Sequence, residues 1–170
     1  AQMYMDTHQY AQALKHLNAI TDLLVPDSRK LAQHIVRMVG LYMEMGNTDM
    51  AKKHLRDLLN HNDHVDKLAV IEQYKRICRM HDDWVDLLDI LQDELCYYLN
   101  IPRDDFSLDA FICAENPDIP VGYAIHTLRE YADVLYNKIG DIEGAARLYQ
   151  LIAVVNPKDS YSFNMLCEML

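Results

Sequence analysis

A spacing of aromatic, small and aliphatic residues recurs around Gly46 and Gly140. Each glycine follows an aromatic residue by four positions, precedes an alanine by five, and precedes further large apolar residues by nine and twelve. Around Gly46 these residues are Tyr42, Ala51, Leu55 and Leu58, and around Gly140 they are Tyr136, Ala145, Tyr149 and Ile152. Such recurrence predicts similar supersecondary units that bury their apolar faces by stacking on one another.

The same offsets hold less strictly when they are counted from two further positions, His8–Gln9 and Asp82–Asp83. We call the positions from which the offsets are counted origins. The four origins, at residues 8, 46, 82 and 140, are separated by 38, 36 and 58 residues, so the last interval holds about 22 residues more than the one before it. An apolar-periodic stretch leads to each origin and another leaves it. Each unit is therefore predicted to be two helices joined by a short turn.

The residues at these turns give a physical reason for helices to end and begin there. Gly46 and Gly140 can adopt the left-handed conformation that ends a helix, while Asn47 and Asp141 can cap the first free amides of the next. The chain has only 5 Gly and 5 Pro in 170 residues, too few for the tight turns of a β-sandwich or barrel. We therefore expect an all-α fold, an α-solenoid of antiparallel helix pairs.

A unit of this kind resembles the tetratricopeptide repeat (TPR), in which a helix pair carries these offsets and a proline near the seventeenth position beyond the turn. Pro157 and Pro26 supply that proline in the last and first units. The resemblance extends over residues 4–26, 38–59, 71–99 and 135–157. It implies a single TPR-like helical-repeat domain over residues 1–170, and because both ends fall inside a unit, we expect a fragment of a longer array.

The additional residues before the last unit form an insertion at 100–122. Its prolines break helices, whereas Phe106 and Phe111 are too apolar for a freely solvated linker. The pattern predicts one short helix over 106–113 with Asp105 as its cap. Two interpretations remain open: a loop packed on its own helices, or a lid that binds a partner.

The charge balance restricts the class of partner. With 16 Lys+Arg against 26 Asp+Glu, the net charge of −10 disfavours nucleic acids and anionic membranes. No apolar run approaches the roughly 20 residues that cross a bilayer. Cys78, Cys96, Cys113 and Cys167 have the spacing of neither a disulfide framework nor a zinc site. These features predict a cytoplasmic protein that binds proteins or peptides, with acidic partners among the candidates.

The sequence contains no recognisable catalytic motif, because none of its serines lies in a nucleophile elbow and no phosphate-binding glycine loop is present. We therefore predict a chain that is not an enzyme and needs no cofactor. One polar cluster leaves a metal-dependent enzyme as an alternative hypothesis, although a solvated turn between repeats explains it better. Its members are His54, His61, Asp63, His64 and Asp66.

The TPR resemblance implies that the first helix of each pair lines a concave groove. Stripes of residues three or four positions apart on those helices are then the predicted partner-binding surface. The predicted site residues are Gln33, Val36, Met43, Glu72, Arg76, Arg79, Glu130 and Asn137. Lys75, Arg76 and Arg79 form a local basic concentration that suits a carboxylate of a partner, while the alternative is an ordinary surface ion pair between Glu72 and Arg76.

These observations favour a protein-interaction scaffold that binds an extended or helical segment in its concave groove. Two alternatives remain: a ligand-sensing regulatory domain, and a structural segment that associates with another copy through exposed terminal helices. The second alternative is motivated by an apolar stripe near the end of the sequence. The stripe comprises Met165, Leu166, Met169 and Leu170.

Overall fold

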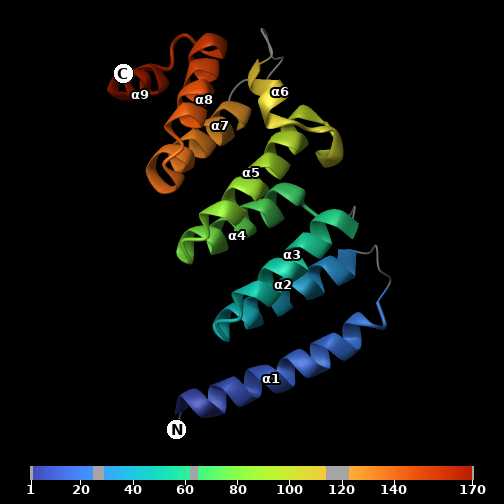
Figure 1. The fold of residues 1–170 in the computed structure, drawn as a ribbon. Helices are drawn as coiled ribbons and strands as arrows, with labels where there is room; N and C mark the ends of the chain where they lie inside the picture. The colour runs from blue at the N-terminus through green and yellow to red at the C-terminus, as the bar shows by residue number, and fades with distance from the viewer. Residues whose placement is uncertain (1, 25–28, 62–64, 114–122, 170) are drawn as a thin grey trace. The chain divides into compact units, whose positions relative to one another are not determined.

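A computed structural model describes residues 2–24, 29–61, 65–113 and 123–169 (Figure 1). This part of the chain is predominantly helical and contains no β-strand, which confirms the all-α prediction. It also contains no helix long and apolar enough to cross a membrane. The chain divides into two compact units, Ala1–Ile77 and Cys78–Leu170, and each is described by itself below.

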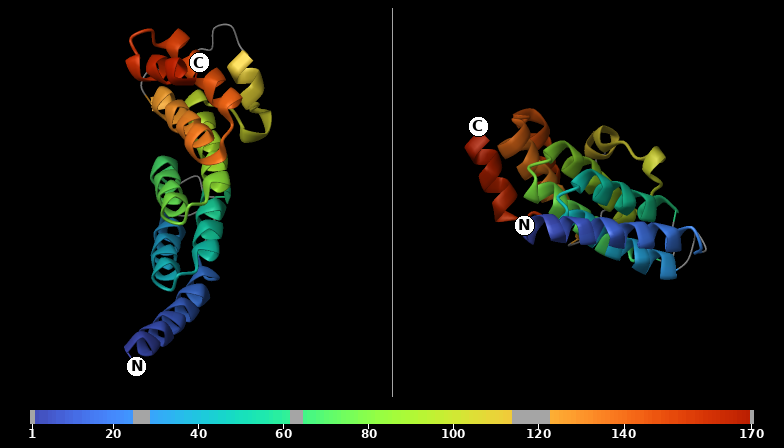
Figure 2. Two further views of the ribbon diagram at one scale, coloured as in Figure 1. Left: turned by 60° about the vertical axis from the view of Figure 1, so that its left-hand side comes forward. Right: turned by 90° about the horizontal axis from the view of Figure 1, so that it is seen from below.

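The first unit holds α1 (Gln2–Thr21), α2 (Arg29–Glu44), α3 (Thr48–His61) and most of α4 (Lys67–Met80). Helix α1 packs on α2, and α2 and α3 lie side by side in all views (Figures 1 and 2). The core of this unit is aliphatic and aromatic, with its helices facing one another through buried side chains. They include Ile35, Met38, Tyr42, Leu55, Leu58 and Tyr74.

The second unit begins in the last turn of α4 and continues with α5 (Trp84–Leu99), α6 (Leu108–Cys113), α7 (Tyr123–Val134), α8 (Ile142–Val155) and α9 (Ser160–Met169). Helix α5 packs on α7, α7 on α8, and α8 on α9. The core between these helices contains Leu87, Leu91, Leu128, Ala145, Tyr149 and Ile152. Residues five, nine and twelve positions beyond Gly46 and Gly140 are thus buried, as the register predicts.

The turn between α2 and α3 shows how the sequence ends one helix and starts the next. Gly46 has a φ of 72°, and its amide donates to the carbonyl of Met43 at 3.0 Å. The amide of Asn47 reaches back to the carbonyl of Tyr42 at 2.8 Å, which closes the helix with a Schellman-type turn. The Asn47 side chain then accepts from the amide of Met50 at 3.3 Å and caps α3.

The turns predicted at residues 82 and 140 use the same conformation. Asp82 adopts it without being a glycine, at a φ of 54°, and the amide of Asp83 donates to the carbonyl of Cys78 at 2.9 Å. Gly140 has a φ of 82°, and the Asp141 side chain caps α8 by accepting from the amide three residues further on at 2.9 Å. The turns predicted at 46, 82 and 140 are therefore confirmed.

The turn predicted at His8–Gln9 is wrong. Helix α1 runs without a break from Gln2 to Thr21. The left-handed position at a helix end is usually glycine and sometimes asparagine, and neither histidine nor glutamine is a preferred N-cap residue. The apolar offsets around residue 8 therefore belong to a single helix.

The register also shifts by one residue before Gly140. Residues Leu135–Ile139 form a π-helical turn, in which the amide of Gly140 donates to the carbonyl of Leu135 at 2.8 Å. Leu135 consequently occupies the buried position that the spacing assigns to Tyr136, and Tyr136 is only half-buried. A π turn holds one residue more than an α turn, which accounts for the difference.

The described part of the insertion packs on helices of its own unit. After a 3-10 turn at Arg103–Asp105, α6 starts at Leu108, and the hydroxyl of Ser107 caps it rather than the predicted Asp105. Arg103 forms ion pairs with Asp89 and Asp93 of α5 at 3.3 and 3.2 Å. These contacts favour the packed-loop interpretation for residues 103–113, while residues 114–122 of the insertion lie outside the described residues.

Two glycines of the first unit test the role of the turn. Gly46→Ala places a side chain in a left-handed conformation and is expected to lower the free energy of unfolding by about 1 to 2 kcal/mol. Gly40→Ala is the matched control, because Gly40 lies inside α2 with open space around an added methyl group. It is expected to raise the free energy of unfolding by about 0.5 to 1 kcal/mol. Urea denaturation followed by circular dichroism measures both, and equal effects of the two substitutions would contradict this assignment.

Candidate functional site

A groove of about 790 Å³ lies between α2 and α4 within the first unit. Its floor includes the buried side chains of Ala32 and Val70, and its walls carry exposed polar and apolar groups. The lining residues are Arg29, Ala32, Gln33, Val36, Arg37, Val65, Asp66, Ala69, Val70 and Gln73. A volume of this size is typical of sites that hold small ligands or short stretches of peptide.

The pattern of α2 explains why this surface remains open. One side of the helix is buried in the unit through Leu31, Ile35 and Met38. Residues of the opposite side recur at spacings of three and four and face the groove, where Val36 remains 39% exposed. The helix therefore presents a mixed polar and apolar stripe that no other described part of the first unit covers.

Helix α4 forms the other wall. Asp66 caps its start by accepting from the amide of Ala69 at 3.2 Å, which fixes where the helix begins. Ala69 is small and exposed, so it leaves space in the groove, and Gln73 lies one turn further along. The guanidinium of Arg56 on α3 covers the ring of Tyr74 at 4.7 Å and attaches α4 to α3.

The lining of the groove combines hydrogen-bonding groups with apolar ones. Its described lining contains no histidine, cysteine or serine, and its one carboxylate, Asp66, accepts from the amide of Ala69. The amides of Gln33 and Gln73 each donate and accept hydrogen bonds, and Arg29 and Arg37 donate from guanidinium groups. Alternating apolar and hydrogen-bonding groups of this kind match the main chain and side chains of a peptide.

The predicted site residues are only partly brought together. Gln33 and Val36 line the groove. Met43 lies on α2, where it is half-buried, and it does not contribute to the lining. Glu72 and Arg76 are exposed on α4 next to the groove but are likewise outside its lining.

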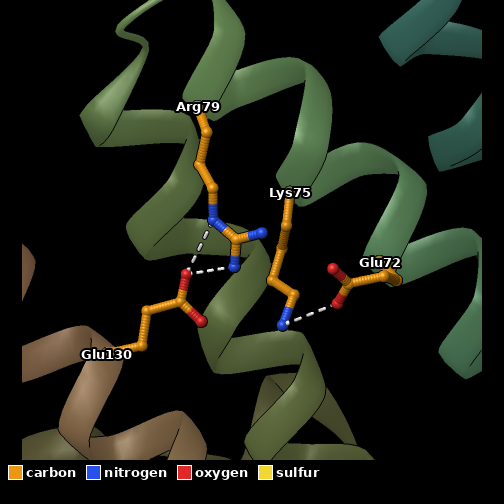
Figure 3. Close-up of polar contacts among 4 residues, drawn as sticks. All are labelled: Glu72, Lys75, Arg79 and Glu130. Atoms are coloured by element: carbon orange, nitrogen blue, oxygen red, sulfur yellow. Dashed lines mark hydrogen bonds and ion pairs between the residues drawn. The ribbon is translucent and has the colours of Figure 1, made fainter.

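Two of the three basic residues predicted to form a cluster on α4, Lys75 and Arg79, are engaged in ion pairs (Figure 3). The Lys75 side chain is only 4% exposed, and its ammonium group lies 3.1 Å from the carboxylate of Glu72. The ion pair considered between Glu72 and Arg76 is therefore replaced by one with Lys75. Since Lys75 is buried, it is not accessible to a partner.

The second ion pair joins Arg79 to Glu130 of α7, inside the second unit (Figure 3). Arg79 Nε donates to Glu130 Oε1 at 3.0 Å, and a second guanidinium nitrogen contacts the same oxygen. Asn137 is also engaged, because its side chain donates to the carbonyl of Asp133 at 3.0 Å. Arg79, Glu130 and Asn137 thus make structural contacts rather than forming part of the groove.

A polar network in the second unit was not predicted. Asp133 of α7 accepts hydrogen bonds from the hydroxyls of Tyr149 and Tyr161, the latter at 3.0 Å. Arg129, one turn earlier, forms an ion pair with Asp159 at 3.0 Å. Burial and the bond to the Asp133 carboxylate raise the pKa of Tyr149 well above its ordinary range. The network joins α7, α8 and the start of α9, which gives it a structural role.

The metal alternative finds no support in the geometry of its described members. Among the described residues no group of three potential ligands is close enough to hold a metal ion, and Asp63 and His64 lie outside them. The His54 ring stacks on Tyr42 with a centroid distance of 5.2 Å. His54 is therefore a packing residue between α2 and α3.

Sequence reasoning missed Arg29, Arg37 and Gln73 as groove residues. A signal for the first two was present, since Arg29, Gln33 and Arg37 follow one another at four-residue intervals on one helix face.

Comparisons with known proteins gave no match: no protein-family model, no curated protein and no solved structure is significantly similar to this chain. The candidate site therefore rests on its geometry and chemistry.

The packing of His54 predicts a pH dependence of stability. Burial lowers the pKa of His54 below its ordinary value, although the carboxylate of Asp57 opposes the shift. The unfolded chain then binds the proton more readily, so the free energy of unfolding should fall as the pH decreases through the unfolded value of about 6.5. His54→Phe keeps a ring against Tyr42 and should reduce this slope in denaturation measurements. His61→Phe, at an exposed position of α3, is the control and should leave the pH dependence of the free energy of unfolding unchanged. If His54→Phe also leaves this pH dependence unchanged, His54 is not its source.

Proposed function

We propose that this chain is a non-enzymatic interaction scaffold whose helix pairs stack as a TPR-like α-solenoid and bind a segment of a partner protein. The observation that carries the proposal is the groove between α2 and α4. In the repeat register, α2 and α4 are the first helices of two consecutive helix-pair repeats. The groove between them therefore corresponds to the face of a repeat that the TPR resemblance assigns to ligand binding.

The repeated turn geometry supports the solenoid part of the proposal. Left-handed residues at positions 46, 82 and 140 each follow a helix end, and another helix starts directly after each of them. The side chains of Asn47 and Asp141 cap two of these three helices. Equivalent turns place equivalent faces of successive helix pairs in register. A stack of such pairs exposes a continuous row of first helices.

The proposed ligand is an extended segment. In such a segment the main-chain amides and carbonyls lack the partners that a helix supplies, and the Gln33 and Gln73 side chains can provide them. Ala32, Val36 and Val70 offer apolar contact for side chains that point toward the floor. Main-chain bonds would supply affinity while the apolar and charged positions supply selectivity.

Filling the groove tests this function. Ala69→Trp introduces a large ring at an exposed lining position, whereas Ala19→Trp makes the same change at an exposed position of α1 that does not line the groove. Peptides selected from a random library on the full chain are expected to bind Ala69→Trp at least about tenfold more weakly, a loss of about 1.4 kcal/mol. Fluorescence anisotropy measures this affinity. Equal binding to both variants would show that the peptides bind elsewhere.

A second candidate function, association between copies of the chain, is favoured by exposed aromatic residues on α9. Phe163 is 62% exposed and Tyr161 is 42% exposed. The stripe predicted from the sequence is less accessible, since Met165, Leu166 and Met169 are half-buried and Leu170 lies outside the described residues. Exposed aromatic surface therefore lies at the start of α9.

Self-association is tested by light scattering over a range of concentrations. If α9 joins two copies, the chain should be dimeric at high concentration, and Phe163→Glu should shift it to the monomer by placing a charge in the contact. Asn164→Glu provides the matched control, because it adds the same charge at the neighbouring exposed position. A chain that remains monomeric at all concentrations excludes this second function.

A further inference from the structure

We infer that the segment bound in the α2–α4 groove is acidic, and that Arg29 and Arg37 hold its Asp or Glu side chains. The inference rests on the proposed function and specifies the chemistry of the ligand. It also places the residues that contact the ligand's carboxylates on α2, whereas the sequence had indicated the basic cluster of Lys75, Arg76 and Arg79 on α4.

The partners of the arginines carry the argument. Of the eight arginines in the sequence, five have ionic or aromatic partners within the chain. Four of them pair with carboxylates, and one covers an aromatic ring. They are Arg79, Arg103, Arg129, Arg147 and Arg56.

The other three arginines, Arg29, Arg37 and Arg76, are exposed and make no ion pair or ring contact with any described residue. All three lie on the helices that form the groove. Arg29 and Arg37 belong to its lining, and Arg76 lies one turn beyond Gln73 on α4. Most arginines of the chain thus have a partner within it, and two of the three that have none among the described residues line the groove.

The charge of the groove is opposite to that of the whole chain. The chain carries −10, whereas the lining holds two arginines and one carboxylate, Asp66. Asp66 accepts from an amide at the start of α4, so part of its charge is already compensated. An acidic ligand would thus be repelled by most of the surface and attracted here, where a guanidinium group can bind a carboxylate through two hydrogen bonds.

The spacing of the two arginines fits an extended ligand. Eight residues of helix separate Arg29 from Arg37, which corresponds to about 12 Å along α2. In an extended segment, side chains four residues apart lie on the same face and are separated by about 13 Å. Acidic residues at positions i and i+4 of the ligand would therefore meet both guanidinium groups.

The lining argues against a nucleic acid as the anionic ligand. Proteins that bind single strands without base pairing usually stack bases on aromatic side chains. The described lining contains no aromatic residue on which a base could stack. Its valines and alanines suit apolar side chains between the acidic residues of a peptide.

Charge reversal tests the inference. Peptides selected from a random library on the full chain are compared for binding to Arg29→Glu/Arg37→Glu and to a control, Lys30→Glu/Lys53→Glu. The control makes the same change in net charge at exposed positions of α2 and α3 outside the groove lining. The selected peptides should be enriched in acidic residues relative to the unselected library. They should bind the groove variant at least about tenfold more weakly and the control nearly as well as the original chain.

Arg29→Gln/Arg37→Gln, which removes charge without reversing it, keeps the test valid if the first variant folds poorly. Peptides that bind Ala69→Trp weakly but lack acidic enrichment would overturn the inference and leave the proposed function standing. Peptides that bind Ala69→Trp as well as the original chain would overturn both. An oligouridine probe that binds as tightly as the peptides and depends on the two arginines would also overturn the inference, in favour of a nucleic acid.

Discussion

The left-handed turn that ends one helix and caps the next is the constraint on which the rest of the structure depends. At Gly46 the amides of two successive residues bond back into α2, and the Asn47 side chain starts α3 immediately. The turn thereby fixes which faces of the two helices meet and which stay exposed. The left-handed conformation recurs at Asp82 and Gly140, so local hydrogen bonding sets three of the helix ends.

Several arginines of the chain are held in internal ion pairs. Arg79 is paired with Glu130, Arg103 with two aspartates of α5, and Arg129 with Asp159. Partly exposed pairs of this type contribute little to stability individually, but they occupy guanidinium groups that would otherwise attract anions. Arg29 and Arg37 in the lining of the α2–α4 groove have no such partner among the described residues. The arginines that remain available to bind an anionic ligand are therefore those that internal ion pairs do not occupy.

The all-helical class, three of the turns and the core positions five, nine and twelve residues beyond Gly46 and Gly140 could be predicted from the sequence, because they depend on residues close together in the chain. Gly46 with Tyr42 and Ala51 is such a set. The π turn that brings Leu135 into the core could not be predicted, because one extra residue in a helical turn leaves no mark in the apolar spacing. The site was only partly predictable, since the pairing of Arg79 with Glu130 joins residues far apart in sequence.

We propose the groove between α2 and α4 as the ligand-binding surface of this chain. Two-dimensional NMR of the isotope-labelled full chain, titrated with a selected acidic peptide, tests it most directly. Amide shifts are expected to change along both walls of the groove, with Gln33, Val36 and Ala69 among the most affected residues. Changes concentrated at Glu130 and Asn137, or on α9, would contradict it.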